Sequence, residues 1–268
     1  MGLIEEILGR PKLRQKLWAW WYPFFTRRVR EQGVDFLNYA FQDSEAKPLT
    51  LTATDEPNRP NIQLYEHVRG DVTLRGLRVL EVSCGHGGGA FYFTRTYRPV
   101  EYVGLDLNPE AIRHCQLRHQ DAGLRFHVGD AQKLPFADSS FDVVINVEAS
   151  HCYPDFPGFV DEVARVLKPG GRFCHADLRY RNGVDEWVAA LAKHPQLRLD
   201  EMRLINLEVI RGMELNTPRY AAMVKQALPG FLQALALDFA GVKGSRLYRD
   251  ALCGEMSYRS FKLTKRPG

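Results

Sequence analysis

The 268-residue sequence lacks any apolar run of the about 18 residues that a membrane-spanning helix requires. Cysteine is also scarce: the five cysteines are scattered and odd in number, which does not suit a disulfide framework. Near the N-terminus, Glu5 and Glu6 stand where a secretory signal would have its apolar core. These absences argue against an integral membrane protein and a secreted disulfide-rich module. They favour a cytoplasmic protein with reduced cysteines.

A strong net charge is missing as well. The formal net charge is +4, and residues 1–30 alone hold seven Lys or Arg side chains against two Glu side chains. The remaining chain is therefore almost neutral and has no basic stripe interleaved with aromatic residues, so nucleic acid is not expected as a partner. The basic excess belongs to a segment that is also rich in aromatic residues, namely Trp18, Trp20, Trp21, Tyr22, Phe24 and Phe25.

Three interpretations of this aromatic and basic segment stay open. It could be a helix packed on the core, a lid over an apolar pocket, or a transient contact of residues 12–30 with a membrane surface. Pro23 interrupts a long amphipathic helix, which disfavours a stable membrane anchor. We take residues 1–60 as an N-terminal lid segment and residues 61–268 as one α/β domain.

From residue 76 onward, short apolar runs alternate with helical patterns. Residues 183–234 have a helical pattern that interrupts the strand series, so we expect a helical insertion that caps the substrate site. The C-terminal residues are expected to add two closing strands joined by a loop. The alternation predicts a Rossmann-like, doubly wound α/β fold with a seven-stranded sheet, mostly parallel with an antiparallel last strand. The first five strands are predicted at 77–83, 101–107, 124–130, 141–148 and 171–178.

A glycine-rich turn, SCGHGGGA at 83–90, follows the first predicted strand. Gly85 and Gly87 fit the GxGxxG/A spacing of dinucleotide-binding folds. Glycine turns before helices are common, so this spacing alone does not identify the ligand.

Acidic residues on three successive strands narrow the choice of ligand. Glu81 in the first strand could anchor an ammonium group, Asp106 could accept ribose hydroxyl protons, and Asp130, before Ala131, could meet an adenine amino group. A pyrophosphate would be repelled by such a ring of acids, whereas a sulfonium cation with an ammonium group would be attracted. The pattern therefore favours S-adenosylmethionine over NAD.

Several motifs resemble those of class I S-adenosylmethionine-dependent methyltransferases: LEVSCGHGGG, YVGLDLNPEAI, GDAQKLPFADSSFDVVINVEAS and VARVLKPGG. Others, such as WWYPFFTR, TDEPNRPNIQLY and GEMSYR, are similar to the mycobacterial phthiotriolone/phenolphthiotriolone dimycocerosate methyltransferases. The resemblance implies O-methylation of a hydrophobic lipid- or polyketide-type hydroxyl or carboxyl group. S-adenosyl-L-methionine would be the cofactor, S-adenosyl-L-homocysteine the product, and no metal is expected.

One position departs from the family pattern: Ser83 stands where the first motif usually has glycine, a change we expect to leave binding intact because serine is small. The full set of expected cofactor-binding residues is Glu81, Ser83, Gly85, Gly87, Asp106, Leu107, Asp130, Ala131 and Asn146.

The stretch NVEASHCY at 146–153 places polar residues after the apolar run 141–145, at the end of the strand predicted at 141–148. His151 follows this strand by a few residues, where the transferable methyl group should point, and an imidazole suits proton removal from a hydroxyl. For an acceptor that is already ionised, such as a carboxylate, His151 would only position it. Asp177, at the end of the next strand, could orient the imidazole, and Glu148 ranks third as a candidate catalytic residue. The alternative for His151 is an ordinary polar loop residue.

The other histidines and cysteines have simpler interpretations. His86 is expected to orient the backbone of the glycine turn, and His175 could share the face of Asp177. A metal site that combines Cys174 and His175 is disfavoured, since neighbouring residues in a strand point to opposite faces.

Alternative functions are not excluded by these motifs. A sterol or terpenoid C-methyltransferase would use a similar loop after the fourth strand. A non-catalytic lipid-binding module could retain the cofactor fold. An NAD-dependent oxidoreductase is disfavoured by the ring of acids. A hydrophobic small molecule is the expected partner, and a homodimer stays open.

Overall fold

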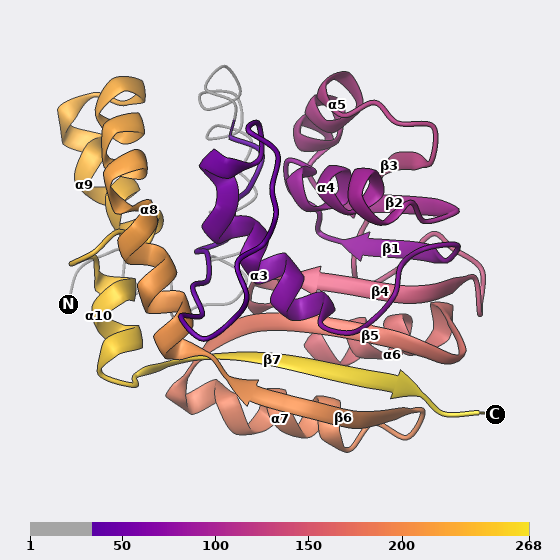
Figure 1. Cartoon of the computed structure of the whole chain (residues 1–268). Coiled ribbons are helices and arrows are strands. Elements are labelled where there is room, and N and C mark those ends of the chain that lie inside the picture. The colour runs from indigo at the N-terminus through magenta and orange to yellow at the C-terminus, as the bar shows by residue number, and fades with distance from the viewer. Residues whose placement is uncertain (1–33, 268) are drawn as a thin grey trace.

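The computed structural model describes residues 34–267 (Figure 1). The aromatic and basic segment, and with it the predicted membrane contact of residues 12–30, lies outside the described residues. No helix in the described part of the chain is both long and apolar enough to cross a bilayer.

A seven-stranded sheet forms the centre of the fold, with strand order β3-β2-β1-β4-β5-β7-β6. β7 runs antiparallel to both of its neighbours, and the remaining strands run parallel to one another. The predicted doubly wound sheet with an antiparallel last strand is therefore confirmed. The strands are β1 (Arg78–Val82), β2 (Glu101–Asp106), β3 (Leu124–Val128), β4 (Phe141–Val147), β5 (Leu167–Tyr180), β6 (Leu197–Leu204) and β7 (Met256–Lys265).

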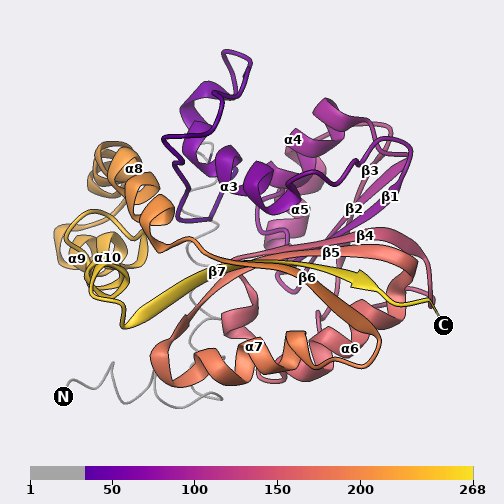
Figure 2. The same cartoon turned by 60° about the horizontal axis from the view of Figure 1, so that its bottom comes forward.

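Helices cover both faces of this sheet, because its central strands are apolar on both sides. On β1, Val79 belongs to the core cluster beneath α3, α4 and α5, whereas Leu80 and Val82 belong to the cluster beneath α6 and α7. Figures 1 and 2 show the two helical layers. Their bounds are α3 (Arg59–Arg69), α4 (Gly88–Tyr97), α5 (Pro109–Arg118), α6 (Phe156–Val166) and α7 (Val184–Ala192).

A third group of helices lies beyond the carboxyl ends of the parallel strands (Figure 1). It consists of α8 (Asn206–Ala227), α9 (Gly230–Phe239) and α10 (Arg246–Leu252). Since ligands of open α/β sheets bind at this edge, these helices border the expected site. The short 3₁₀ helices are η2 (Glu56–Asn58), η3 (Ser150–Cys152) and η4 (Arg181–Gly183).

Two expectations about the C-terminal half were wrong in part. Residues 183–234 are not helical throughout, because Leu197–Leu204 form strand β6. In this stretch Leu197 and Leu199 alternate with Arg198 and Asp200, a period of two that suits an edge strand paired with β7.

The C-terminal residues also do not form two strands. Helix α10 takes the place of the first, because Ser245 caps it: the Ser245 hydroxyl accepts a hydrogen bond from the Tyr248 N–H at 3.1 Å. Only β7 follows, and the seventh strand of the sheet is supplied by β6.

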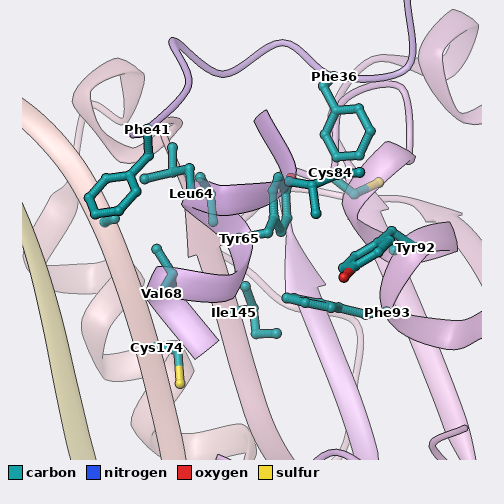
Figure 3. Close-up of a cluster of buried hydrophobic side chains, with 14 of the residues drawn as sticks. Phe36, Phe41, Leu64, Tyr65, Val68, Cys84, Tyr92, Phe93, Ile145 and Cys174 are labelled. Atoms are coloured by element: carbon teal, nitrogen blue, oxygen red, sulfur yellow. The ribbon is translucent and has the colours of Figure 1, made fainter. Parts of the chain in front are cut away.

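Residues 34–42, which we call the crossing segment, connect the described N-terminus to the body of the fold. Figure 3 shows Phe36 and Phe41 with their rings in the buried cluster around Tyr65 and Leu64. The Phe36 and Tyr65 rings meet edge to face at 5.8 Å, and the Phe41 ring stacks on His67 at 4.4 Å. These aromatic contacts fix the crossing segment on α3.

Candidate active site

The glycine turn joins β1 to α4 through backbone conformations that only glycine adopts easily. Gly85 and Gly87 have φ angles of 54° and 77°. A Cβ atom on Gly87 would lie 2.9 Å from the Cys115 sulfur and 3.0 Å from the Phe126 ring. The close approach of α5 and β3 therefore explains why glycine is needed here.

Ser83 shares the left-handed conformation of the neighbouring glycines, with a φ of 60°. This geometry explains why glycine is usual at this position in the family, since a side chain in this region is strained. Its hydroxyl lies 2.6 Å from the hydroxyl of Tyr153, a residue that the sequence reasoning did not single out.

Asp106 holds the turn from the neighbouring strand. One carboxylate oxygen accepts a hydrogen bond from the Gly85 N–H at 2.9 Å, and the other accepts one from the Asn108 N–H at 2.9 Å. Burial raises the pKa of Asp106, and these two hydrogen bonds partly oppose the rise. The adjacent Leu107 is 59% exposed, so an apolar surface stands beside the carboxylate.

Glu81 lies deeper than expected. It is 1% exposed, and its two carboxylate oxygens accept hydrogen bonds from the Tyr65 and Tyr102 hydroxyls, each at 2.8 Å. Burial raises its pKa to about 7, although the two phenols oppose this shift. A role in anchoring an ammonium group stays a prediction, and both oxygens already have partners.

Asp130 and Ala131 follow β3 at the edge of the sheet. Asp130 is exposed, and its carboxylate accepts a hydrogen bond from the Gln132 N–H at 2.9 Å. Ala131 is buried beside it. The structure thus places Asp106, Leu107 and Asp130 at successive strand ends, as the sequence predicts.

His151 and Asp177 meet at the ends of β4 and β5. The His151 Nδ1 atom lies 2.7 Å from one Asp177 carboxylate oxygen, and the backbone N–H of His151 donates to the other oxygen at 2.9 Å. Asp177 is fully buried, whereas the His151 side chain is 25% exposed. The carboxylate therefore fixes the orientation of a ring that is accessible at its outer edge.

Each member of the His151–Asp177 pair stabilises the charged form of the other. Burial alone would raise the pKa of Asp177, but His151 and Arg179 lower it far below its usual range. Burial alone would lower the pKa of His151, but Cys152 and Asp177 raise it well above its ordinary value. Ser150 also donates a hydrogen bond to Asp177 at 2.6 Å. The arrangement holds one imidazole nitrogen on a permanently ionised carboxylate.

Glu148 supports the neighbouring loop in a left-handed backbone conformation, with a φ of 50°. Its carboxylate accepts hydrogen bonds from the Tyr39 N–H at 2.8 Å and from the Tyr258 hydroxyl. Burial raises its pKa to about 8, although these hydrogen bonds oppose the rise. The contacts show Glu148 joining the crossing segment and β7 to the end of β4. A direct catalytic role stays a prediction.

Replacement of Glu148 by glutamine should raise the midpoint of thermal unfolding at pH 9 by a few degrees, with a smaller change at pH 6. The raised pKa means that the fold favours the protonated acid. Stability is therefore lost as the pH rises from the unfolded pKa of about 4.3 through the folded value of about 8. Glutamine keeps an acceptor oxygen without the charge.

Glu162→Gln is the matched control, because the hydrogen bond from Arg165 lowers the pKa of Glu162. That variant should lower the unfolding midpoint at pH 9. A Glu148→Gln protein that unfolds at a lower temperature than wild type at pH 9 would contradict this account.

His86 and His175 have hydrogen-bond and ring partners of their own. The His86 Nδ1 atom contacts the Val34 carbonyl at 2.6 Å, in agreement with a role in orienting the turn. His175 is buried between the rings of Phe173 and Phe261, and burial lowers its pKa to about 4. Within residues 34–267, no group of three or more potential ligand side chains could hold a metal ion.

Asn146 is fully buried behind the glycine turn. Its side-chain amide donates to the Val82 carbonyl at 2.9 Å and to the Tyr153 hydroxyl at 3.0 Å. The amide oxygen has no hydrogen-bond partner among the described residues. Such an orphaned acceptor is costly unless a ligand or water satisfies it.

The crossing segment joins the glycine turn to the end of β4. The Asp35 carbonyl accepts a hydrogen bond from the Gly88 N–H at 3.0 Å, and Leu37 lies 3.1 Å from where a Cβ atom on Gly85 would be. Four residues later, the Tyr39 N–H donates to Glu148. The sequence offered no signal for these contacts, because most of them involve the backbone.

These residues fit the adenosyl and amino-acid parts of S-adenosylmethionine. Asp106 and Leu107 place a carboxylate beside an apolar face, and the Asn146 oxygen has no hydrogen-bond partner among the described residues. Gly85 of the turn carries no side chain, and Leu37 of the crossing segment lies against it. The His151–Asp177 pair stands at the carboxyl ends of the next two strands, β4 and β5. A doubly wound, mostly parallel sheet with this turn and these acids is the architecture of a class I methyltransferase.

Comparison with known proteins agrees with this class. Residues 80–175 match a family model described as a methyltransferase domain. The chain is 47% identical, over 96% of its own length and 95% of the relative's, to the phthiotriol/phenolphthiotriol dimycocerosates methyltransferase of Mycobacterium leprae. It is 44% identical, over 91% of its length and 88% of the relative's, to the fatty-acid O-methyltransferase of Mycolicibacterium smegmatis. The chain belongs to the S-adenosylmethionine-dependent methyltransferases.

A solved structure with similar geometry is the [4+2]-cyclase SpnF, with a TM-score of 0.70 at 18% identity, covering 95% of this chain and 97% of that one. At this identity the likeness shows the fold alone. Since a cyclase has the same fold, the activity of the present chain rests on its sequence relatives and its site.

Proposed function

We propose that this enzyme transfers a methyl group to the oxygen of a hydrophobic acceptor, a lipid- or polyketide-type hydroxyl or carboxyl group, with His151 as base or positioning residue. The observation that carries the proposal is the 2.7 Å contact between His151 Nδ1 and the buried Asp177. In the neutral ring, an ionised Asp177 favours the proton on Nδ1, which would leave Nε2 to accept the proton of the substrate.

The chain's own residues perform three tasks in this reaction. The glycine turn and Asp106 orient the cofactor, which supplies the electrophilic methyl group when bound. His151 Nε2 accepts the proton of a hydroxyl acceptor as its oxygen becomes a nucleophile, and Asp177 stabilises the imidazolium that forms. For a carboxylate acceptor no proton is removed, so His151 only positions the oxygen.

The apolar character of the acceptor is supported by helix α9. Its sequence, GFLQALALDF, has one charged residue, yet Leu235 is 43% exposed. A helix so apolar is normally buried, so its exposed face suits an apolar ligand. After α9, a Cβ atom on Gly241 would lie 2.7 Å from the ring of Tyr39, and the backbone N–H of Tyr39 donates to Glu148. The names of the two relatives support the same class of acceptor.

The proposal is tested with acceptors that share one hydroxyl or carboxyl group and differ in alkyl chain length. Burial of each added methylene stabilises a complex by about 0.8 kcal/mol, so kcat/KM should rise about three- to fourfold per methylene until the pocket is filled. Mass spectrometry of the product identifies a methyl ether or a methyl ester. A flat series, or methylation only of polar acceptors, would reject the hydrophobic acceptor.

The pH dependence of kcat/KM for a hydroxyl acceptor is expected to rise with pH and to level off well above pH 6.5. The basic form of His151 is required, and Cys152 and Asp177 raise its pKa above the ordinary value of about 6.5. Asp177→Asn should move the rising limb to lower pH and reduce the plateau, because the carboxylate no longer stabilises the imidazolium. A limb that stays in place in Asp177→Asn would contradict this coupling.

Location and partners are also part of the proposal. We infer a cytoplasmic enzyme that takes a hydrophobic small molecule and does not bind nucleic acid. A transient contact of residues 12–30 with a membrane surface stays open. A homodimer stays open. The near-neutral charge of the chain after residue 30 and the apolar surface of α9 support this inference.

A further inference from the structure

Tyr153 links two parts of the site that are far apart in the sequence. It follows η3 directly, two residues after His151, and its ring packs edge to face on Phe159 of α6 at 4.9 Å. Its hydroxyl reaches back to the glycine turn, 2.6 Å from the Ser83 hydroxyl and 3.0 Å from the Asn146 amide nitrogen. The loop that carries His151 is thereby tied to the turn that carries the cofactor.

The orientation of the Asn146 amide follows from the two acceptors that its nitrogen meets. The Asn146 amide nitrogen donates one hydrogen to the Val82 carbonyl and the other to the Tyr153 hydroxyl. A flipped amide would set its oxygen against the Val82 carbonyl oxygen, so the orientation is fixed. Tyr153 thus accepts from Asn146 and shares a second hydrogen bond with Ser83, in which either hydroxyl is able to donate. A chain of hydrogen bonds therefore runs from Asn146 through Tyr153 to Ser83.

The end of this chain is the strained residue of the turn. Ser83 has a φ of 60°, and unlike glycine it adopts this region only against a steric cost. The short hydrogen bond with Tyr153 offsets part of that cost in the folded state. Without it, Ser83 would relax towards negative φ, and the direction of the backbone leading to Gly85 would change.

We propose that Tyr153 is a positioning residue for the cofactor: its hydroxyl holds Ser83 in the left-handed conformation that shapes the glycine turn. In this chain a serine and a tyrosine thus perform together the task for which the family usually employs a glycine. The role is separate from the acceptor and from the proton transfer at His151.

The test measures binding of S-adenosylhomocysteine by calorimetry in a cycle of variants. Tyr153→Phe should raise its dissociation constant about tenfold, the effect of losing one buried hydrogen bond. Ser83→Gly alone should bind about as well as wild type, since glycine needs no support at this φ. The double variant Ser83→Gly/Tyr153→Phe should recover to within about threefold of Ser83→Gly.

Ser83→Ala removes the other hydroxyl of the same hydrogen bond. It should weaken binding of S-adenosylhomocysteine about tenfold, because the backbone strain at residue 83 stays and the hydrogen bond is lost. Tyr97→Phe is the structural control: its hydroxyl donates to Glu66 at 2.6 Å, away from the turn. That variant should lower the unfolding temperature without changing the dissociation constant. The proposal is overturned if Tyr153→Phe binds S-adenosylhomocysteine within twofold of wild type. It is also overturned if adding Ser83→Gly to Tyr153→Phe fails to restore this binding. Neither readout needs an acceptor, so both are independent of the proposed function.

Discussion

Replacement of His151 by alanine is expected to lower kcat for a hydroxyl acceptor by about 10²- to 10⁴-fold, the usual contribution of a general base. The dissociation constant for S-adenosylhomocysteine should change little, because His151 lies after β4 and not in the glycine turn. Steady-state kinetics with saturating cofactor, beside calorimetry of product binding, measures both quantities. A large loss of kcat with an unchanged dissociation constant for the cofactor product would show that His151 acts on the acceptor and not on the cofactor.

A second histidine provides the control for this variant. His194 contacts Asp161 at 3.0 Å, also as a His–Asp pair. It follows α7 and precedes β6, so it does not lie at the carboxyl ends of β4 and β5, where His151 lies. His194→Ala should leave kcat unchanged. If His151→Ala retains more than a third of wild-type kcat with a hydroxyl acceptor, His151 is an ordinary polar loop residue.

The chemistry of the acceptor changes the size of this effect. A fatty acid is ionised near neutral pH, since a carboxyl group has a pKa of about 4, and needs no base. His151→Ala should therefore cost much less with a carboxylate than with a hydroxyl acceptor. The ratio of the two losses separates proton removal from positioning of the acceptor oxygen.

Replacement of Gly87 by alanine is expected to abolish measurable cofactor binding, a loss of at least 100-fold. The φ of 77° costs a side chain about 1–2 kcal/mol, and a new Cβ atom would stand 2.9 Å from the Cys115 sulfur. Either α5 or the turn must move, and the cofactor cradle is lost. Calorimetry with S-adenosylhomocysteine and thermal unfolding measure the two consequences.

Gly170 is a close match for this substitution, because it has the same φ of 77° but open space around it: a Cβ atom there would meet no atom within 4 Å. Gly170→Ala therefore carries the conformational cost without the steric contact. It should lower the unfolding temperature modestly and leave cofactor binding intact. Equal binding losses in Gly87→Ala and Gly170→Ala would mean that strain alone, and not the contact with Cys115, disrupts the site.

Much of the fold was predictable because its signals are local. The strands that form the centre of the sheet are short apolar runs bounded by turns, which the sequence shows directly. Leu197–Leu204 was wrongly predicted as part of a helical insertion. It is an edge strand with charged residues on its exposed face, and its alternation of apolar and polar residues extends over only a few positions. Helix α10 was missed although Ser245 offered a capping signal.

The site was predictable where residue type and strand position agree. His151 and Asp177 come together because β4 and β5 are parallel neighbours, which the order of motifs implied. Tyr153 and the crossing segment were missed for a different reason. Their contacts with Ser83 and Gly88 depend on distances between loops, and no periodicity or spacing in the chain encodes those distances.

The most direct test of the central claim follows a labelled methyl group from S-adenosylmethionine into a mixed panel of fatty acids, lipid alcohols, sterols and polar metabolites. The products are partitioned between organic solvent and water, with wild type and His151→Ala in parallel. We predict label in the organic phase, as methyl ethers or esters, with the ether fraction lost in the variant. Label confined to the aqueous phase, or hydroxyl methylation that persists unchanged in His151→Ala, would contradict the account.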